Sequence, residues 1–535
     1  MLFLRHIRLA AAPVVGLLLL GAVSHADAQR VDAQQPRKVD DAALRNAGKS
    51  GEDWLTYGRD PGETRFSPLN QINASNVNRL GLLWSYDLGA GGGNQEATPL
   101  ERNGVLYTIT NWSVVVAVDV RTGKQLWKWD PEVNQSAVFP KICCGVVHRG
   151  LAMYQNLIIA PIIDGRLQAL DADTGKVVWE ARVAYPQDNY TVTMAPRIAK
   201  GKVIVGVSGS EYPVRGFFSA FDALTGHFAW KFYTVPGDSW DYDSVQQLLL
   251  ADITVKGKPR KVIMQANKDG FYYVLDRATG QFISGQPFAQ VTWARGLNEE
   301  TGRPIINQAA HYGTDTITLS PGPGGAHNWA PMSFNPATGL VYIPTSAAST
   351  YDFTVDDKFV YKDGEKNLGV VRPGTQAATA DTAGTAVANK PTTKLSSPPA
   401  IGPEAPPPGQ RGLLMAWDPV TQKERWRAPG GGSIGGGTVT TAGNLVFQVI
   451  PDGRLMAYRA DTGEKLLEIK TGLRGGMGPP ITYQIDGKQY ITLGGGTGRV
   501  TPSVGTPAPA AASGPGPALP KLLTFVLDGT GTLPQ

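Results

Sequence analysis

The chain has 535 residues, with 50 Lys and Arg against 45 Asp and Glu, which gives a formal net charge of +5. So mild an excess, without a basic block, does not indicate a nucleic-acid partner. The chain has 64 Gly, 40 Pro and 12 Trp, and only 18% of its residues are charged. This composition predicts an all-β chain of short strands joined by tight turns.

The N-terminal residues have the pattern of a secretory signal peptide. Two arginines precede an apolar run over residues 9–22, and residues 26–28 (Ala-Asp-Ala) match an A-x-A cleavage site. The run is short for a membrane span. We therefore expect cleavage after Ala28, a polar lead over residues 29–50, and a periplasmic mature protein without a membrane span.

A short motif recurs along the chain, in which Asp, Thr-Gly and a terminal Trp follow one another. A strand that ends in Asp leads into a turn where Asp caps backbone donors and Gly takes the left-handed position. The first spacings are about 50 residues, the period of a four-stranded propeller blade. The strong copies end at Trp127, Trp179 and Trp230, and the weaker copies cover residues 274–280, 416–426 and 457–463.

These copies predict a β-propeller with seven blades, over residues 51–535. The tryptophans of the motif, including Trp426, are expected to dock one blade on the next rather than to bind a cofactor. We expect an early strand at 82–86 to join a late strand at 522–527, which would leave no free edge in the ring. Two stretches outside the repeat, about 375–411 and 501–520, are expected to be mobile surface excursions.

Three carboxylates stand close together around Trp240, namely Asp238, Asp241 and Asp243. On an extended segment, residues two apart point to the same side, so Asp241 and Asp243 are expected to converge. Like charges this close favour a cation between them. The alternative is an acidic turn in solvent.

The two cysteines of the chain, Cys143 and Cys144, are neighbours. In an oxidising compartment they predict a strained vicinal disulfide near a site. The alternative is a pair of reduced, buried thiols.

With these features the chain resembles the quinoprotein alcohol dehydrogenases, periplasmic propeller enzymes that use pyrroloquinoline quinone (PQQ) and a metal ion. The resemblance covers about residue 54 to the last strand. The segments that carry it are 54–60 with 65–69, 143–150, 193–196, 208–211 with 214–216, and 325–329.

The resemblance implies a role for each matching residue. The cofactor-binding residues would be Cys143, Cys144, Arg149, Thr193, Ser208, Gly209, Lys268 and Asn328. The metal ligands would be Glu211, Asp241 and Asp243, and Asp241 would also be the general base that takes the proton of the alcohol. Simpler roles remain open: Glu211 as an ion-pair partner of Arg215, Arg149 as a surface or cap residue, Lys268 as an exposed turn lysine, and His327 as a structural hydrogen-bonding residue.

An acidic residue two places after the catalytic Asp resembles the lanthanide-dependent branch of the family, so Asp243 favours a lanthanide(III) ion over Ca(II). A calcium enzyme is the alternative. The sequence has no Cys-x-x-Cys-His motif, so we expect a separate electron acceptor, a cytochrome c. The expected substrate is a small alcohol, and a homodimer remains open.

The sequence also departs from the family pattern. Family members have eight blades, but residues 231–237 here leave no room for the blade that carries a stacking Trp and an Asn ligand. The loop at residues 430–437 has only small residues and Ile434, where relatives place a Trp or Asn near the quinone. The rival hypothesis is therefore a degenerate propeller that serves as a protein-binding scaffold.

Overall fold

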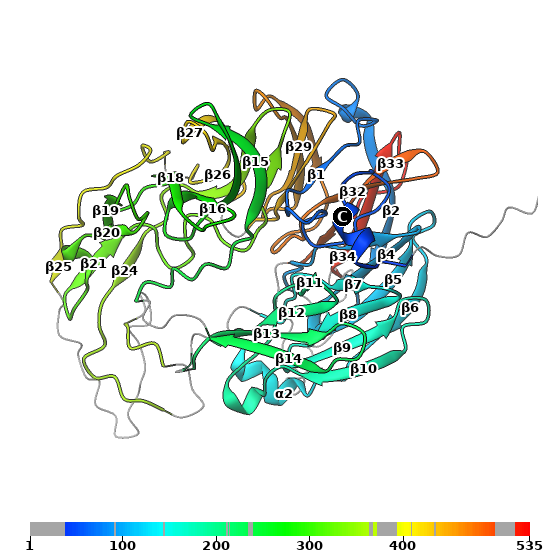
Figure 1. Cartoon of the computed structure of the whole chain (residues 1–535), viewed down its shortest axis with the longest axis horizontal. Coiled ribbons are helices and arrows are strands. Elements are labelled where there is room, and N and C mark those ends of the chain that lie inside the picture. Colours follow the sequence, from blue (N-terminus) through cyan, green and yellow to red (C-terminus); the bar gives the residue numbers. More distant parts are fainter. Residues whose placement is uncertain are drawn as a thin grey trace, which may run out of the picture. The chain divides into compact units, whose positions relative to one another are not determined.

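Strands make up most of the ordered structure (Figure 1). The computed structural model describes residues 38–89, 93–142, 145–209, 212, 214–233, 239–362, 367–371, 393–407, 409–432, 435–497 and 519–534. Its helices are short: α1 (Asp41–Asn46), η1 (Val77–Arg79), η2 (Asn111–Ser113), α2 (Gln135–Val138), η3 (Phe139–Lys141), η4 (Pro186–Asp188) and η5 (Gln308–Ala310). The first of these, α1, lies in the lead for which the sequence indicated no element.

Six sheets have their strands in chain order, each strand antiparallel to the next. Three come from the first half of the described chain: β3 (Leu100–Arg102), β4 (Val105–Ile109), β5 (Val115–Asp119) and β6 (Gln125–Trp129); β7 (Ala152–Tyr154), β8 (Leu157–Pro161), β9 (Arg166–Asp171) and β10 (Val177–Arg182); β11 (Arg197–Ala199), β12 (Lys202–Gly206), β13 (Phe217–Asp222) and β14 (Phe228–Tyr233). The others are β15 (Leu249–Val255), β16 (Lys258–Ala266), β17 (Phe271–Asp276) and β18 (Phe282–Pro287); β22 (Ser333–Asn335), β23 (Leu340–Ser346), β26 (Gly412–Asp418) and β27 (Lys423–Pro429); β28 (Thr438–Thr441), β29 (Leu445–Val449), β30 (Arg454–Arg459) and β31 (Lys465–Lys470).

A closing sheet combines both ends of the described chain. Its strands are β32 (Ile481–Ile485), β33 (Lys488–Gly495), β34 (Lys521–Leu527) and β2 (Leu80–Asp87). Strand β2 runs antiparallel to β34, with Leu82 opposite Phe525 and Tyr86 opposite Leu522. The predicted pairing of an early strand with the last strand is thus confirmed. The described residues form seven sheets of this kind, and the number of blades in a closed ring stays a prediction.

The turn between the last two strands of a sheet follows the predicted chemistry. Asp119 Oδ1 accepts hydrogen bonds from the backbone nitrogen and hydroxyl of Thr122, at 2.8 and 2.7 Å, and Gly123 has a φ of 69°. The same bonds recur from Thr174 to Asp171. An Asp acceptor and a left-handed Gly are what a tight turn of this type requires.

Tryptophans join neighbouring sheets through these turns, as predicted for Trp127, Trp179 and Trp426. Each indole nitrogen donates to the carbonyl that follows the Asp position of the next turn: Trp84 to Val120, Trp127 to Ala172, Trp179 to Ala223 and Trp426 to Ala460, at 2.7, 2.9, 3.3 and 3.0 Å. The turn glycine lies against the indole ring. A Cβ atom on Gly175, for example, would come within 2.7 Å of the Trp127 ring, so a larger residue there would push the sheets apart.

The prediction is wrong for Trp230. Its side chain is 42% exposed. A Cβ atom on Gly280, the turn glycine of the following sheet, would meet no atom within 4 Å. No core cluster of the described residues combines apolar side chains of β11–β14 with those of β15–β18. The docking that joins other successive sheets is therefore not made at this position.

An N-terminal segment also ties together sheets that are distant in sequence. Strand β1 (Phe66–Ser67) runs parallel to β28. The preceding Arg65 is fully buried and donates to the carbonyls of Tyr57, Thr438 and Pro480 at 2.6, 2.8 and 2.7 Å. A buried guanidinium is stable only when its donors are paired in this way.

Two small sheets were not expected from the repeat. One pairs β19 (Ala294–Leu297) with β20 (Pro304–Ile306), and the other has β21 (Thr316–Leu319) between β24 (Tyr351–Phe353) and β25 (Lys394–Leu395). Strand β25 and a bridge from Ile401 to Val291 lie within the expected excursion at 375–411, so its last part is ordered, contrary to the prediction. Residues 375–392, 408 and 501–518 lie outside the described part of the chain.

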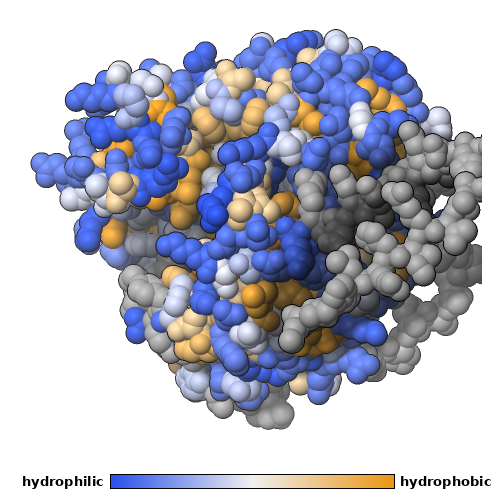
Figure 2. All heavy atoms as spheres, turned by 45° about the vertical axis from the view of Figure 1, so that its right-hand side comes forward, coloured by the Kyte–Doolittle hydropathy of each residue, from blue (hydrophilic) through white to orange (hydrophobic). Residues whose placement is uncertain are grey.

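Apolar residues of five sheets share one core cluster, and a second cluster joins β15–β18 to the β22–β27 sheet. On the face in Figure 2, hydrophilic residues (blue) predominate and hydrophobic residues (orange) form patches between them. Within the described ranges, no helix has the length and apolarity needed to cross a membrane.

Candidate active site

Two of the predicted carboxylates lie against the same ammonium group, that of Lys268. Lys268 Nζ lies 3.0 Å from Asp241 Oδ1 and 2.6 Å from Asp243 Oδ1. The lysine side chain is only 5% exposed, whereas the carboxylates are 54% and 46% exposed. The convergence of Asp241 and Asp243 is therefore confirmed, and Lys268 is not an exposed turn lysine.

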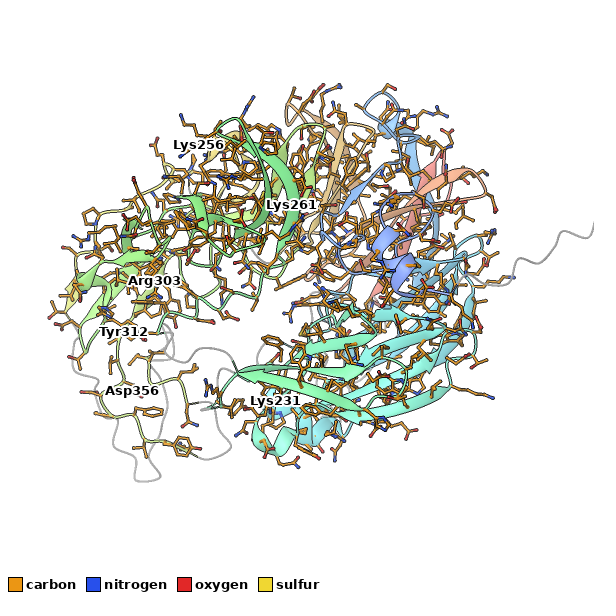
Figure 3. All side chains as sticks on the ribbon, viewed as in Figure 1. Lys231, Lys256, Lys261, Arg303, Tyr312 and Asp356 are labelled. Atoms are coloured by element: carbon orange, nitrogen blue, oxygen red, sulfur yellow. The ribbon has the colours of Figure 1, made fainter. Side chains whose placement is uncertain are left out.

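The sequence predicted an extended backbone at these two residues. The backbone that brings them together is not extended. Asp241 has a φ of 62°, in the left-handed region, and belongs to no strand. Aromatic neighbours hold it there: the rings of Trp240 and Tyr242 stack with centroids 6.0 Å apart, and the Tyr242 hydroxyl donates to the Pro321 carbonyl at 2.6 Å. The hydroxyl of Tyr312, labelled in Figure 3, donates to the Ser239 carbonyl at 2.8 Å.

The pKa values of Asp241 and Lys268 in this cluster are both raised, for different reasons. Burial raises the pKa of Asp241 to about 7, with the Asp243 charge adding to the rise and the Lys268 charge opposing it. Burial acts to lower the pKa of Lys268, but Asp243 and Asp241 outweigh it, so that this pKa is raised. A carboxyl group with a pKa near neutrality is suited to general-base catalysis.

A second cluster surrounds Arg149. Its Nη1 donates to Thr193 Oγ1 at 2.8 Å, and that hydroxyl lies 2.9 Å from Ser208 Oγ. Arg149 Nη2 is 3.1 Å from Glu96 Oε2, whose side chain is 3% exposed. Burial raises the pKa of Glu96, and the Arg149 charge opposes this. These contacts exclude the reading of Arg149 as a surface residue.

Gly209 lies beside this cluster and needs to be glycine. Its φ is 149°, and a Cβ atom there would lie 2.6 Å from the Asn189 carbonyl oxygen. The neighbouring Ser208 forms a β-bridge with Thr191, which places both hydroxyls of the predicted pair, at positions 193 and 208, on adjacent segments.

Residues 325–329 connect the two clusters. Ala326 N donates to the Lys268 carbonyl at 2.9 Å, and a Cβ atom on Gly325 would lie 2.6 Å from Lys268 Cγ. At the other end, the Arg149 guanidinium lies 5.4 Å from the centre of the Trp329 ring. Asn328 lies between these contacts, and its amide donates to the Gly324 carbonyl at 2.9 Å. Seven predicted residues therefore belong to one connected region: Arg149, Thr193, Ser208, Asp241, Asp243, Lys268 and Asn328.

Three of the predicted site residues, Cys143, Cys144 and Glu211, lie outside the described residues, as does Asp238. The disulfide and the pairing of Glu211 therefore stay predictions. Among the residues that the structure describes, no group of three His, Cys, Asp or Glu side chains could hold a metal ion.

Both buried histidines near the clusters have structural roles, as expected for His327. Its Nδ1 donates to the Pro344 carbonyl at 2.8 Å, and burial lowers its pKa to about 4. His148 Nε2 lies 2.7 Å from Ser113 Oγ, and burial, with the Arg149 charge, lowers its pKa to about 3.

Glu96 and a separate role for Trp329 were not apparent from the sequence. Both touch Arg149 in the structure. Glu96 follows a glycine-rich stretch with no recognisable motif, so nothing in its neighbourhood marked it. Trp329 ends the segment 325–329, and its proximity to a predicted arginine could have been found only from the fold.

The chemistry of these side chains fits the group that the resemblance implies. Arg149 Nε is buried and has no hydrogen-bond partner within the described part of the chain. With the Thr193 and Ser208 hydroxyls it forms a donor set suited to the carboxylates of a quinone acid. Asp241 and Asp243 already surround a cationic group, which suits part of a site for a hard metal ion.

Sequence comparisons point to one family. The family model described as "Glucose/ethanol/alcohol dehydrogenase, beta-propeller domain" (PQQ) matches residues 54–238, 218–296 and 313–491. The quinohemoprotein alcohol dehydrogenase ADH IIB of Pseudomonas putida is 38% identical over 596 residues, covering 93% of this chain and 80% of that protein. The 1-butanol dehydrogenase (cytochrome c) of Thauera butanivorans is 34% identical, covering 84% and 75%.

Solved structures give the same result. The quinohemoprotein alcohol dehydrogenase of Comamonas testosteroni superposes with a TM-score of 0.77 at 34% identity, covering 92% of this chain and 82% of that one. A europium-containing methanol dehydrogenase superposes with a TM-score of 0.76 at 26% identity, covering 91% and 100%.

Proposed function

Because this chain belongs to the PQQ-dependent alcohol dehydrogenase family, a family of β-propeller oxidoreductases, we propose how its own residues oxidise an alcohol to an aldehyde or ketone. One observation carries the proposal: the Asp241, Asp243 and Lys268 cluster and the Arg149 cluster are joined by a single segment, residues 325–329. A scaffold protein needs no such region of converging charges.

Asp241 is the general base. Its carboxylate accepts the hydroxyl proton of the alcohol. Trp240 and Tyr242 fix the backbone on either side of it, so that the carboxylate stays oriented while the substrate changes. Lys268 limits the electrostatic repulsion between the two carboxylates.

Arg149, Thr193 and Ser208 hold the cofactor by its carboxylates, and Asn328 and Lys268 contact it from the segments that they occupy. Gly209, Cys143 and Cys144 complete this set in the proposal. When bound, PQQ supplies the electron acceptor for the oxidation, and a metal ion makes its carbonyl carbon more electrophilic. The protein supplies alignment, charge and the base.

Asp241, Asp243 and Glu211 are the proposed metal ligands. A lanthanide(III) ion is favoured over Ca(II), because a third carboxylate stabilises a trivalent ion more than a divalent one. The europium in the methanol dehydrogenase of similar fold is in keeping with this choice.

The proposed acceptor of electrons is a separate cytochrome c, which the name of the Thauera relative also mentions. We further propose a small alcohol as substrate and export to the periplasm through residues 1–28. We also propose that a blade is missing next to residues 231–237. The alignment with the Pseudomonas relative covers 596 positions, more than the 535 residues of this chain, so it contains gaps in the sequence of this chain.

The test is reconstitution of the purified protein with PQQ and either La³⁺ or Ca²⁺, followed by dye reduction with ethanol or 1-butanol. We expect activity with at least one metal ion. Asp241→Asn should lower kcat by about 100- to 10,000-fold, the usual contribution of a positioned base. Wild-type protein that reduces no dye with either ion would contradict the proposal.

Asp243→Ala tests the choice of metal. If Asp243 serves the trivalent ion, the variant should lose La³⁺-dependent activity and keep more of any Ca²⁺-dependent activity. Asp252→Ala is the matched control, since Asp252 is an exposed acid paired with Arg277 on a strand surface. Equal losses with both ions would contradict the lanthanide assignment but not the general base.

A further inference from the structure

The loop that carries Asp243 follows Trp240 and has no regular secondary structure up to Leu249. The Asp243 carboxylate lies 2.6 Å from Lys268 Nζ, although it is 46% exposed. An ion pair with so exposed a carboxylate contributes less free energy than the ordering of one loop residue costs. Another contact is therefore needed to hold Asp243 beside the lysine.

A side-chain amide supplies this contact. Asn267, the residue before Lys268, is 5% exposed. Its Nδ2 donates at 2.8 Å to the Oγ of Ser244, the residue after Asp243. This hydrogen bond joins the turn that carries the lysine to the loop that carries the acid, one residue away from each charge.

The orientation of the Asn267 amide follows from its other neighbours. The backbone nitrogen of Asp269 can only donate, and it lies 3.2 Å from Asn267 Oδ1, so the amide oxygen faces the turn. One hydrogen of Nδ2 goes to Gln265 Oε1 at 3.0 Å. The other hydrogen is left for Ser244, whose hydroxyl oxygen accepts it.

Two more side-chain amides continue this network. Gln265 Nε2 donates to the Gln246 carbonyl at 3.0 Å. Gln246, which is 4% exposed, donates in turn from its Nε2 to the His327 carbonyl at 3.1 Å. The loop is therefore tied to both of the other segments of the candidate site, the turn after β16 and residues 325–329.

We propose that Ser244 and Asn267 are positioning residues, whose hydrogen bond holds Asp243 against Lys268. Asp241 does not depend on this bond, because aromatic rings hold it from the other side. The consequence for catalysis rests on the proposed function, in which Asp243 is a metal ligand. There the pair sets the affinity for the metal ion rather than the rate of proton transfer.

Ser244→Ala is the test, because Ser244 is exposed and its replacement should leave the fold intact. The full-length protein without PQQ is titrated with Tb³⁺, whose luminescence is excited through nearby indoles such as that of Trp240. We expect the variant to bind Tb³⁺ about tenfold more weakly than wild type, the effect of one lost hydrogen bond. Ser244→Thr keeps the hydroxyl group and should bind as wild type does.

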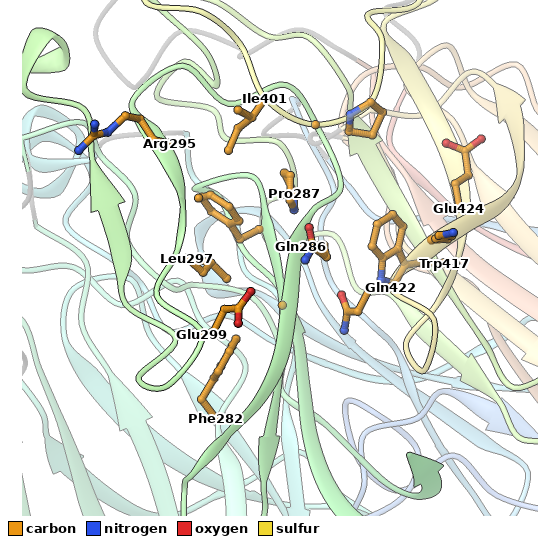
Figure 4. A pocket seen from close by; sticks show the side chains of 16 residues that line it. Phe282, Gln286, Pro287, Arg295, Leu297, Glu299, Ile401, Trp417, Gln422 and Glu424 are labelled. Carbon is orange, nitrogen blue, oxygen red and sulfur yellow. The ribbon is translucent and has the colours of Figure 1, made fainter. Parts of the chain in front are cut away.

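Ser284→Ala is the matched control, because Ser284 Oγ also accepts a side-chain amide, that of Gln422, at 3.1 Å. Figure 4 shows Gln422 at a cavity of about 580 Å³, whose lining includes none of the predicted site residues. The control loses the same kind of hydrogen bond and should keep the wild-type affinity for Tb³⁺. Equal losses in the two variants would overturn the proposal, as would an unaffected Ser244→Ala variant.

The enzyme reconstituted with PQQ gives a second readout. Ser244→Ala should need about ten times more La³⁺ for half-maximal activity, whereas its kcat at saturating La³⁺ should fall far less than that of Asp241→Asn. The double variant Ser244→Ala/Asn267→Ala should bind Tb³⁺ no more weakly than Asn267→Ala alone, because the two side chains share one hydrogen bond. A lower kcat with an unchanged La³⁺ requirement, or additive losses, would overturn the proposal.

Crystal structures without PQQ or metal give a result that does not depend on the proposed function. In Ser244→Ala the Asp243 carboxylate should leave hydrogen-bonding distance of Lys268 Nζ, while Asp241 keeps its contact. In Ser244→Thr both contacts should remain. An unchanged contact between Asp243 and Lys268 in Ser244→Ala would overturn the proposal. Wild-type protein that binds no Tb³⁺ would contradict the proposed metal ligands, and the crystal structure alone would then decide this inference.

Discussion

A buried ammonium group requires counter-charges, and Lys268 has two in Asp241 and Asp243. The three side chains depend on one another: the lysine offsets the repulsion between the acids, and the acids stabilise a lysine that is 5% exposed. In the proposed function, the same two carboxylates also hold the metal ion.

Replacing Lys268 by Met should therefore make stability depend on added cations. Without metal, the variant leaves two close carboxylates unscreened, and we expect a loss of about 1–3 kcal/mol in the free energy of unfolding. Added La³⁺ should restore the melting temperature, measured by calorimetry. Lys261→Met, on the strand β16 and marked in Figure 3, is the control that should respond to neither change.

The buried histidines predict loss of stability in acid. The pKa of His327 is about 4 and that of His148 about 3, both below the value of about 6.5 in an unfolded chain. As pH falls below about 6.5, the unfolded chain binds protons that the folded protein does not. Each histidine should thus lower the free energy of unfolding by up to about 1.4 kcal/mol per pH unit.

His327→Gln tests this slope, because Gln can still donate to the Pro344 carbonyl. Urea unfolding from pH 7.5 to 4.5 should show a shallower decline for the variant than for wild type. Parallel curves would show that His327 does not contribute to acid sensitivity.

At the level of the element, the contact that recurs in this fold is between a turn glycine of one sheet and the tryptophan ring of a neighbouring sheet. Gly175 and Gly280 occupy the same place in the same turn, with φ values of 71° and 75°. Only Gly175 has a docked ring above it, that of Trp127. Comparing substitutions at Gly175 and Gly280 therefore separates two costs: that of a left-handed backbone in the turn, and that of displacing the indole between two sheets.

Gly280→Ala should cost about 1 kcal/mol, from the left-handed backbone alone. Gly175→Ala should cost about 1–3 kcal/mol more, since its Cβ atom has to displace the Trp127 ring. Thermal unfolding of both variants measures the difference. Equal losses would mean that Trp127 adjusts without a penalty and that the indole contact is loose.

The repeat made these elements readable from the sequence, because Asp, Thr, Gly and Trp each have a fixed chemical task in the turn. The docking of Trp127, Trp179 and Trp426 was predictable for this reason, whereas the exposure of Trp230 was not. The motif of Trp230 is intact, and whether its indole is buried depends on the position of the neighbouring sheet, which the motif does not determine. The strand β25 was missed because two residues in a Pro-rich stretch carry no periodic pattern.

The candidate site was predictable to a similar extent. The family resemblance located Arg149, Thr193, Ser208 and Lys268, and the structure places the first three in one hydrogen-bonded cluster and Lys268 beside Asp241. The left-handed backbone at Asp241 was not predictable, because Asp adopts that conformation only when its surroundings, here aromatic neighbours, impose it. Glu96 belongs to no motif and reaches Arg149 only through the fold.

At the level of the whole molecule, the closing sheet joins strands that are far apart in sequence. Strand β34 lies between β2 and β33, so it pairs on both sides. A central strand contributes two ladders of hydrogen bonds and a buried face, which makes it more important than an edge strand.

A chain that ends after residue 520 should therefore fail to fold. We expect loss of the size-exclusion peak of the folded protein and of the cooperative melting transition, because β2 and β33 would each have a free edge. A chain that ends at residue 534 keeps β34 and should behave as the full chain does. A truncated chain that folds and elutes as the full chain does would show that β2 needs no partner.

The pairing of Leu80–Asp87 with Lys521–Leu527 also has a consequence for synthesis. The strand β2 leaves the ribosome hundreds of residues before its partner β34 has been made, so it cannot pair while the sheets that follow it in sequence are folding. During that interval its unpaired backbone is open to wrong partners. We therefore expect biogenesis to depend on a holdase that shields this segment until the last residues of the polypeptide have been made.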